Sequence, residues 1–340
     1  MKNILIFIAS LCLFLTARVS AAQAFDSSKL GVHILNVHEL EAAKRLVSPS
    51  VLGASTQIDY QHCNYVTIPI TLDDLTAEKK IEWQAFFDQA KVLKIIPIIR
   101  LTTRFSLEKN VWVVPNKKQI IDQINFLSSL NWPTNKMYLI AYNEVNHAAE
   151  WGGRVDPAGY AKTLKFVSNW AHTEGKEYVI LPAAMDLAAA NTARTWEAFH
   201  YLSQLYAVDP EIFSYIDVWN SHSYPNPGFA SSPTRYGKNS LRGFENELSF
   251  LADKTGRNFQ VMITETGWQE TPYLSRWLES YYTYAMQHIW SDERVIAVTP
   301  FLLKGAPGPF AGFSFFDESN EPSNQFHSFR AALEKLSKEI

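Results

Sequence analysis

Cysteine is scarce in this chain, which excludes one common source of stability. The 340 residues include two cysteines, Cys12 and Cys63. Cys12 lies in an apolar N-terminal run that we expect to be cleaved off, so the mature chain would keep one cysteine and form no internal disulfide. With 47% hydrophobic residues, the chain is long enough for one large core, and we expect its stability to come from that core.

A strong excess of one charge is also lacking. The formal net charge is -3 at pH 7, and removal of Lys2 and Arg18 with the N-terminal run would make it slightly more negative. Such a balance gives no reason to expect nucleic acid or an anionic membrane as a partner. We expect a neutral ligand and a monomeric chain.

Sequence signatures of metals and nucleotides are missing as well. The chain has no His-x-His pair on its first expected strand and no His-Glu-x-x-His segment, so the main metallohydrolase patterns are absent. No glycine-rich phosphate loop follows that strand, which reads Val-His-Ile-Leu-Asn-Val over 32–37. The sequence therefore calls for neither a metal nor a nucleotide cofactor.

Only one long apolar run is present, and it lies at the N-terminus. Lys2 precedes the apolar residues 4–15, and small residues then lead to Ala22-Gln23-Ala24. This pattern is typical of a secretory signal peptide, residues 1–24, cleaved after Ala24. No later run approaches the roughly 20 apolar residues of a membrane span. We expect residues 25–340 to form a secreted or periplasmic domain with no membrane span.

Short runs rich in Val and Ile alternate with segments of helical periodicity along the mature chain. The expected strands are 31–36, 65–71, 94–101, 137–144, 178–184, 215–222, 260–265 and 295–303. The clearest expected helices are 77–91, 116–129, 157–173 and 274–291. Eight repeated βα units predict an α/β fold, a single (β/α)8 TIM barrel, with an open doubly wound sheet as the alternative.

Two of these strands end in a glutamate. The fourth expected strand closes with Asn143-Glu144 and the seventh with Glu265. The carboxyl ends of barrel strands face the active-site mouth, and strands four and seven lie across the barrel, so these side chains can converge. A pair of carboxyl groups that converge in this way suits cleavage of a glycosidic bond, because one group protonates the leaving oxygen and the other attacks or stabilises the anomeric carbon.

The Asn-Glu dipeptide alone identifies little, because it occurs three times. Asn246-Glu247 lies in a helical pattern over 244–254, and Asn320-Glu321 precedes a proline in a turn-prone segment. Neither follows an apolar strand, so we expect both to be at the surface.

Segments around the two glutamates resemble clan A of the retaining glycoside hydrolases, which are TIM barrels. Residues 142–146 and 263–268 are similar to the two signature segments of the family of β-1,3-glucanases and related transglycosylases, and Tyr224-Pro225 is similar to that family's Tyr-Pro element. The chain departs from the family at Gln269, where the family has proline, and at Tyr142, where it usually has glycine. These departures leave the family, and so the linkage cleaved, open.

The resemblance implies roles for four residues. Glu144 would be the general acid and then the base, and Glu265 the nucleophile. Asn143 would bind the sugar 2-hydroxyl, and Tyr224 would donate a hydrogen bond to Glu265. For Tyr224 the alternative is a packing role in a proline-rich turn. A retaining mechanism requires the two carboxyl groups to lie roughly 5 Å apart.

Charged neighbours would have to separate the pKa values of the two carboxyls. Arg100, at the end of the third strand, would supply a positive charge near Glu265 or form a structural salt bridge. His222 would line the sugar site or bond Asp217, and His33 would be a core histidine or line the pocket.

Aromatic residues make up 14% of the chain, which suits stacking on sugar faces although most of the rings belong to the core. Trp268, just after Glu265, is the expected sugar platform. Trp151 and Phe301 are weaker candidates that core or rim packing explains equally well.

Three functions follow from these residues. The first is hydrolysis or transglycosylation of a β-linked carbohydrate substrate. The second is glycan binding on a catalytically inactive barrel, which would need the aromatic platform but not both carboxylates. The third is unrelated barrel chemistry, which requires Glu144 and Glu265 to lie far apart.

Overall fold

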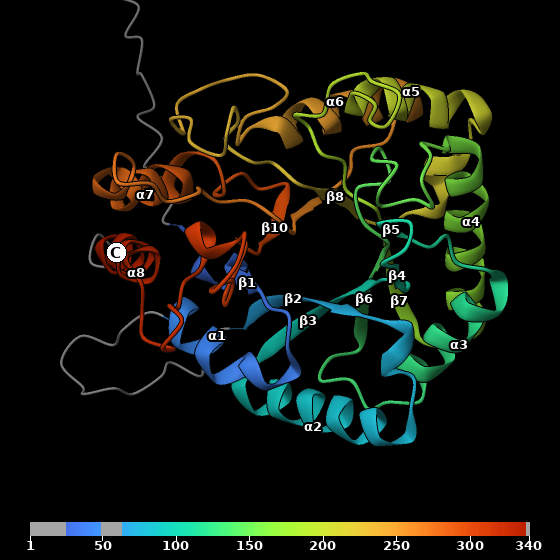
Figure 1. Cartoon of the computed structure of the whole chain (residues 1–340), viewed down its shortest axis with the longest axis horizontal. Helices are drawn as coiled ribbons and strands as arrows, with labels where there is room; N and C mark the ends of the chain where they lie inside the picture. The colour runs from blue at the N-terminus through green and yellow to red at the C-terminus, as the bar shows by residue number, and fades with distance from the viewer. Residues whose placement is uncertain (1–24, 49–62, 338–340) are drawn as a thin grey trace, which may run out of the picture.

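Eight parallel strands alternate with helices in the computed structural model, which describes residues 25–48 and 63–337 (Figure 1). The expected signal peptide lies outside these residues. The barrel strands are β1 (Gly31–His33), β2 (Asn64–Ile70), β3 (Ile95–Leu101), β6 (Lys136–Ala141), β7 (Glu177–Pro182), β8 (Trp219–Ser221), β9 (Val261–Ile263) and β10 (Val295–Val298). Each overlaps an expected strand, but several are shorter than expected. β1, β6, β9 and β10 end earlier than expected, because the chain turns into irregular backbone where it borders a pocket. β8 begins later than expected, because a 3-10 helix, Ile212–Tyr215, occupies the start of the expected strand.

The strands form two parallel sheets that meet along both edges. One sheet has the order β1-β2-β3-β6-β7 and the other β10-β9-β8. Asp217, just before β8, donates its backbone N–H to the carbonyl of Ile180 in β7 at 2.9 Å. On the other edge Leu30 and Val298 form a parallel bridge between β1 and β10. The sheet is therefore a closed barrel, which confirms the (β/α)8 fold and excludes the open sheet.

Helices surround the barrel and cover its outer face (Figure 1). They are α1 (Leu40–Val47), α2 (Ala77–Leu93), α3 (Lys117–Ser128), α4 (Pro157–Thr173), α5 (Ala198–Val208), α6 (Gly243–Thr255), α7 (Leu278–His288) and α8 (Asn324–Ser337). Local sequence sets several of their starts. Pro157 occupies the first position of α4, where its missing N–H costs nothing, and Asp156 caps this helix by accepting from the N–H of Gly159.

The strands are buried on both faces, which explains why they are continuous apolar runs. Between the barrel and the helices lies one extensive apolar core. Inside the barrel a smaller cluster consists of Ile98, Tyr138, Ile140, Leu181, Val218, Met262 and Ala297. Within residues 25–48 and 63–337, no helix is both long enough and apolar enough to cross a membrane.

A chain of polar side chains links the strands near the carboxyl end of the barrel. The hydroxyls of Thr67 and Thr299 are 2.8 Å apart, and Thr299 also donates to the carbonyl of Thr264 at 2.8 Å. The hydroxyl of Thr264 donates to Asn220 Oδ1 at 2.6 Å, and Asn220 Nδ2 donates to the carbonyl of Pro182 at 3.0 Å. These bonds join β2, β10, β9, β8 and β7 just below the pocket and hold the strand ends in register.

A small hairpin that the sequence pattern did not reveal follows β3. Strands β4 (Phe105–Ser106) and β5 (Val111–Trp112) pair in antiparallel fashion. With two residues each, they are too short to give a recognisable alternation. The hairpin brings Trp112 to the pocket.

The environment of Glu247 corrects one expectation. This residue of α6 is fully buried rather than at the surface, because α6 packs it against β8, where the hydroxyl of Ser221 donates to Glu247 Oε2 at 2.5 Å. Burial raises the pKa of Glu247 to about 7, although the Ser221 hydrogen bond opposes the shift. The other Asn-Glu pair that was expected at the surface, Asn320-Glu321, is exposed.

The raised pKa of Glu247 predicts a pH-dependent stability. Below the ordinary glutamate pKa both the folded and the unfolded chain carry the proton. As the pH rises to about 7 the unfolded chain loses it first, so the free energy of unfolding falls by up to about 3 kcal/mol. Glu247→Gln should remove this component. In urea unfolding between about pH 4 and 8, the free energy of unfolding of the variant should therefore rise relative to that of the wild type as the pH rises. Asp253→Asn, at an exposed position of the same helix, is the control. If the difference in unfolding free energy between the wild type and Glu247→Gln stayed constant with pH, the raised pKa of Glu247 would be contradicted.

Candidate functional site

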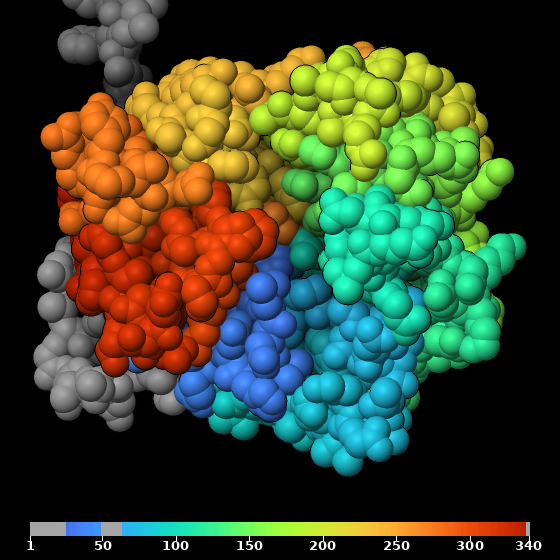
Figure 2. Space-filling view, in the orientation of Figure 1, coloured from blue at the N-terminus to red at the C-terminus, as the bar shows by residue number. Residues whose placement is uncertain are grey.

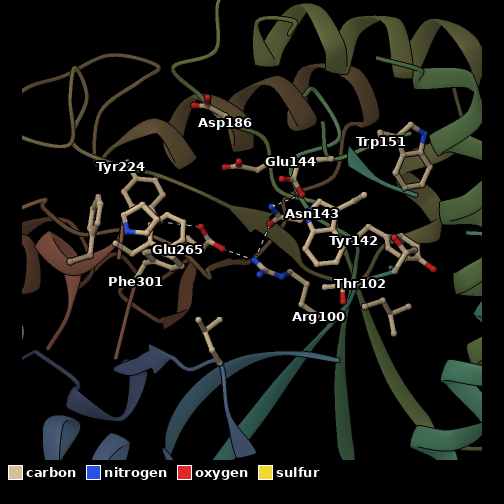
Figure 3. Close-up of a pocket in the computed structure, with 18 of the residues that line it drawn as sticks. Arg100, Thr102, Tyr142, Asn143, Glu144, Trp151, Asp186, Tyr224, Glu265 and Phe301 are labelled. Atoms are coloured by element: carbon tan, nitrogen blue, oxygen red, sulfur yellow. Dashed lines mark hydrogen bonds and ion pairs between the residues drawn. The ribbon is translucent and has the colours of Figure 1, made fainter. Parts of the chain in front are cut away.

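A pocket of about 480 Å³ opens at the carboxyl ends of the strands. Figure 2 shows this face of the molecule hollowed near its centre, between the blue N-terminal, teal and red C-terminal segments. Its lining includes Glu144, Glu265, Asn143, Arg100 and Tyr224 (Figure 3). The pocket thus lies where the βα loops of a barrel build binding sites.

Glu144 reaches the pocket through a strained loop that follows β6. The backbone φ angles of Tyr142 and Glu144 are 74° and 32°, in the left-handed region that side chains other than glycine avoid. Glycine would adopt such an angle without strain, but this chain has a tyrosine there. Here burial of the Tyr142 ring against Trp151 helps to hold the loop in place.

Glu265 follows β9 and is surrounded by groups that stabilise its charge. Arg100 Nη1 donates to Glu265 Oε1 at 2.5 Å, and the hydroxyl of Tyr224 donates to Oε2 at 3.1 Å. Nδ1 of His33 lies 3.5 Å from Oε1 and Nδ1 of His222 lies 3.7 Å from Oε2. The carboxyl group is thus contacted from β3, from the loop after β8, and from β1.

These contacts determine the charges in the site. Burial alone would raise the pKa of Glu265, but the positive charges of His222 and Arg100 outweigh it and lower the pKa to about 2. Burial likewise opposes the charge of His222, yet the carboxylates of Glu265 and Glu144 raise its pKa overall. Burial and the charge of Arg100 lower the pKa of His33 to about 3, so its ring is neutral near pH 7.

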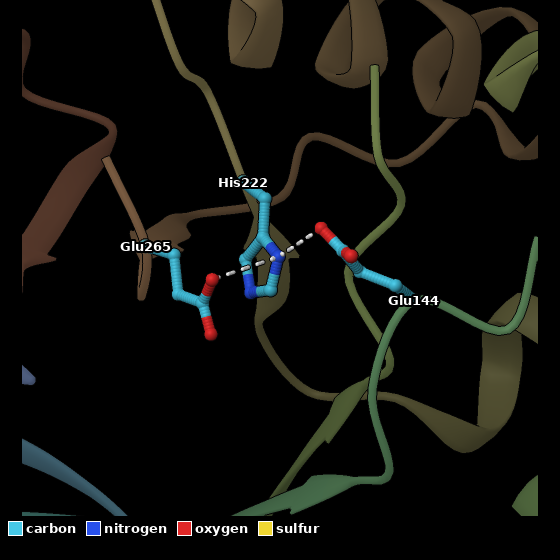
Figure 4. A group of neighbouring side chains, drawn as sticks. All are labelled: Glu144, His222 and Glu265. Carbon is cyan, nitrogen blue, oxygen red and sulfur yellow. Dashed lines mark hydrogen bonds and ion pairs between the residues drawn. The ribbon is translucent and has the colours of Figure 1, made fainter. Parts of the chain in front are cut away.

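His222 lies between the two glutamates (Figure 4). Its Nδ1 is 3.0 Å from Glu144 Oε1 and 3.7 Å from Glu265 Oε2. One side-chain oxygen of Glu144, one of Glu265 and a ring nitrogen of His222 all lie within 4.8 Å of one another. The alternative partner Asp217 instead accepts the backbone N–H of Ile180 at 2.7 Å.

The same three atoms have the spacing of a metal site, the one such group among residues 25–48 and 63–337. Two carboxylates and an imidazole are suitable ligands for a divalent cation. The guanidinium of Arg100, however, already contacts the Glu265 carboxylate at 2.5 Å. Its positive charge opposes a second cation at that carboxylate.

Asn143 connects the two sides of the site. Its Oδ1 accepts from Arg100 Nη1 at 2.9 Å, and its Nδ2 lies 3.4 Å from Glu150 Oε2. The structure therefore brings together six of the seven expected site residues, which are Glu144, Glu265, Asn143, Tyr224, His222 and Arg100.

Trp268 is the exception, and the expectation that it forms a sugar platform is wrong. Its side chain is fully buried, packs edge-on against Tyr282, and donates its indole N–H to the carbonyl of Ser231 at 2.8 Å. Its position after Glu265 suggested the pocket, but the glycine before it has a φ of 119° and the ring lies in the core instead. Phe301 lines the pocket, and Trp151 lines it with an almost wholly buried ring.

Several lining residues were not expected from the sequence. They are Leu35, Leu101, Thr102, Thr103, Trp112, Val113, Glu150, Asp186, Phe229, Gln269, Pro309, Phe310 and Phe313. Most lie in loops with no periodic pattern, so sequence alone carried no signal for them. Trp112, partly exposed on its hairpin and in edge contact with Phe105, is an available aromatic surface in place of Trp268.

Comparison with known proteins gives structural similarity only. No protein-family model matches the chain, and no curated protein sequence matches it. The structure is similar to GH5_18 from Streptomyces cattleya in complex with GlcNAc, with a TM-score of 0.61, 13% identity, and coverage of 93% of this chain and 82% of that one. It is also similar to Cel5A from Thermotoga maritima in complex with cellobiose, with a TM-score of 0.54, 11% identity, and coverage of 90% and 96%.

A glucosidase from Croceicoccus marinus is a third similar structure, with a TM-score of 0.56, 7% identity, and coverage of 85% of this chain and 65% of that one. At such identities the similarity establishes the fold, and the chain is a (β/α)8 barrel of the class these proteins share. The particular reaction depends on the residues of its own site and not on the fold.

The Arg100–Glu265 pair predicts a pH-dependent loss of stability in Arg100→Ala. The lowered pKa of Glu265 stabilises the fold above the ordinary glutamate pKa, and this contribution is lost as the pH falls towards 2. Without Arg100 the carboxylate is buried without its ion-pair partner, so we expect destabilisation of about 3–5 kcal/mol near pH 7 that shrinks towards about pH 4. Chemical unfolding at the two pH values measures it.

Arg104→Ala is the matched control. Arg104 pairs with Asp73 at 2.6 Å on the exposed surface, so its loss should cost at most about 1 kcal/mol at either pH. Equal costs for the two variants would contradict a stabilised Glu265 charge.

Proposed function

We propose that this protein is a retaining glycoside hydrolase of the clan A type, with Glu265 as nucleophile and Glu144 as acid and base. The observation that carries the proposal is the approach of the two carboxyl groups, whose nearest oxygens lie within 4.8 Å. Retaining enzymes hold these groups about 5–5.5 Å apart, whereas inverting enzymes leave about 6.5–9.5 Å for a water molecule. The short spacing also argues against the third candidate function, unrelated barrel chemistry, because that function required Glu144 and Glu265 to lie far apart.

The environment of Glu265 suits the role of nucleophile. Glu265, held ionised by Arg100 and Tyr224, attacks the anomeric carbon and forms a glycosyl ester while the bond to the leaving oxygen breaks. Glu144 gives its proton to that oxygen. Water then attacks the anomeric carbon, Glu144 takes the water's proton, and the ester bond to Glu265 breaks. Asn143 would donate to the sugar 2-hydroxyl.

We further propose a β-linked poly- or oligosaccharide as the substrate, a β-glucan first among them, with transglycosylation as a variant of the same chemistry. The support is the similarity of residues 142–146 and 263–268 to the β-1,3-glucanase and transglycosylase segments. Action outside the cytoplasm is part of the proposal and rests on the signal-peptide pattern of residues 1–24.

The first test is substitution of the two carboxyls. Glu265→Gln should reduce hydrolysis of an activated aryl β-glycoside to background, because no covalent intermediate can form. Glu144→Gln should lower the rate by about 10²–10⁴-fold on substrates with poor leaving groups and far less on activated ones. Steady-state kinetics on both substrate types measures the difference, and azide should restore part of the Glu144→Gln rate on an activated substrate.

Unchanged turnover in Glu265→Gln would remove the nucleophile assignment, provided that both variants melt near the wild-type temperature. Loss of activity in excess EDTA, with recovery on addition of a divalent cation, would instead favour the metal arrangement of Glu144, His222 and Glu265. If the protein binds glycans but hydrolyses no β-glycoside, the alternative function, glycan binding on a catalytically inactive barrel, would be supported instead.

The linkage and the stereochemistry need a separate experiment. Incubation with β-glucans, mannans, xylans and galactans, with analysis of product lengths, should show cleavage of a β-linked polymer and distinguish endo from exo action. NMR of the first product should show retention of the anomeric configuration. An inverted product would be incompatible with the double displacement.

A further inference from the structure

Glu150 places a third carboxyl group in the same pocket, six residues after Glu144. The loop that carries it is fixed to the β4–β5 hairpin by backbone hydrogen bonds on either side. Trp112 donates its N–H to the carbonyl of Ala149 at 2.7 Å, and Gly152 donates to the carbonyl of Trp112 at 2.8 Å. The N–H of Glu150 itself donates to the carbonyl of His147 at 3.1 Å. The position of this carboxyl is therefore set by the surrounding backbone.

The side chain of Glu150 faces one specific partner. Because Arg100 can only donate, its bond to Asn143 fixes which end of the amide is oxygen. The nitrogen must then point the other way, where Glu150 Oε2 lies 3.4 Å from it. An amide nitrogen carries two hydrogens, so one can be held by Glu150 while the second points elsewhere in the pocket.

No ion pair competes for Glu150. None of the salt bridges among residues 25–48 and 63–337 includes it, whereas Glu265 pairs with Arg100 and Asp186 with His147. Burial raises the pKa of Glu150 to about 7, and the nearby charge of Glu144 adds to the shift. A partly buried carboxyl that lacks an ion-pair partner is costly, so a role in the site accounts for it better than a role in stability.

We propose that Glu150 is a positioning residue that orients the Asn143 amide towards the 2-hydroxyl of the sugar. This inference rests on the proposed function. Asn143 is held at both ends, by Arg100 at its oxygen and by Glu150 at its nitrogen. The free N–H is thereby directed before substrate binds. Hydrogen bonds to the 2-hydroxyl strengthen in the transition state, so this orientation acts on kcat more than on KM.

An aryl β-glycoside and its 2-deoxy analogue test the proposal. Glu150→Leu should lower kcat on the parent glycoside by about 10-fold or more with little change in KM, and alter kcat on the 2-deoxy analogue less than about 2-fold. Glu150→Gln should retain most of the rate, because its amide oxygen still accepts from Asn143. The double variant Glu150→Leu/Asn143→Ala should be no slower than Asn143→Ala alone.

Glu177→Leu is the control, since Glu177 is exposed at the start of β7, at the opposite end of the barrel, and both rates should stay within about 2-fold. Equal losses on the two substrates in Glu150→Leu, or no loss on either, would overturn the inference. Should Glu150→Leu fail to fold, Glu150→Ala makes the same comparison. A wild type that cleaves neither glycoside would defeat the proposed function itself, whereas an active wild type with a selective Asn143→Ala defect would leave that function standing.

Discussion

The ion pair between Arg100 and Glu265 is the contact on which the rest of the site depends. A carboxylate buried in the mouth of a barrel is stable as an anion only beside a positive charge, and Arg100 Nη1 supplies that charge at 2.5 Å. The same guanidinium nitrogen holds Asn143, and Asn143 in turn reaches Glu150. One cation from β3 thus organises groups from the segments that follow β9 and β6.

The barrel makes this arrangement possible by placing strand ends at one rim. Hydrogen bonds through Thr67, Thr299, Thr264 and Asn220 hold five strands in register directly beneath the pocket. Above this layer the backbone departs from regular geometry, as the positive φ of Tyr142 shows. Strain of this kind persists only where the surrounding packing holds it, and here it turns Glu144 towards His222.

The strands and the position of Glu144 and Glu265 at the rim were predicted correctly for the same reason. Both are local features: an apolar run of five to eight residues reads as a buried strand, and a glutamate at its end must face the rim. This local pattern could not predict the surroundings of three other side chains, those of Trp268, Glu247 and Glu150. Whether Trp268 turns into the core, whether α6 turns Glu247 towards β8, and whether a loop returns Glu150 to the pocket depend on packing between segments far apart in sequence.

The sequence by itself determined the βα order, the barrel and the two strands that a glutamate closely follows, because periodicity and strand ends are written in consecutive residues. Only the tertiary structure decided that the carboxyl oxygens of Glu144 and Glu265 lie within 4.8 Å and that His222 lies between them. The physical reason is that such distances are set by barrel closure and loop strain. Both arise from contacts that span the whole chain.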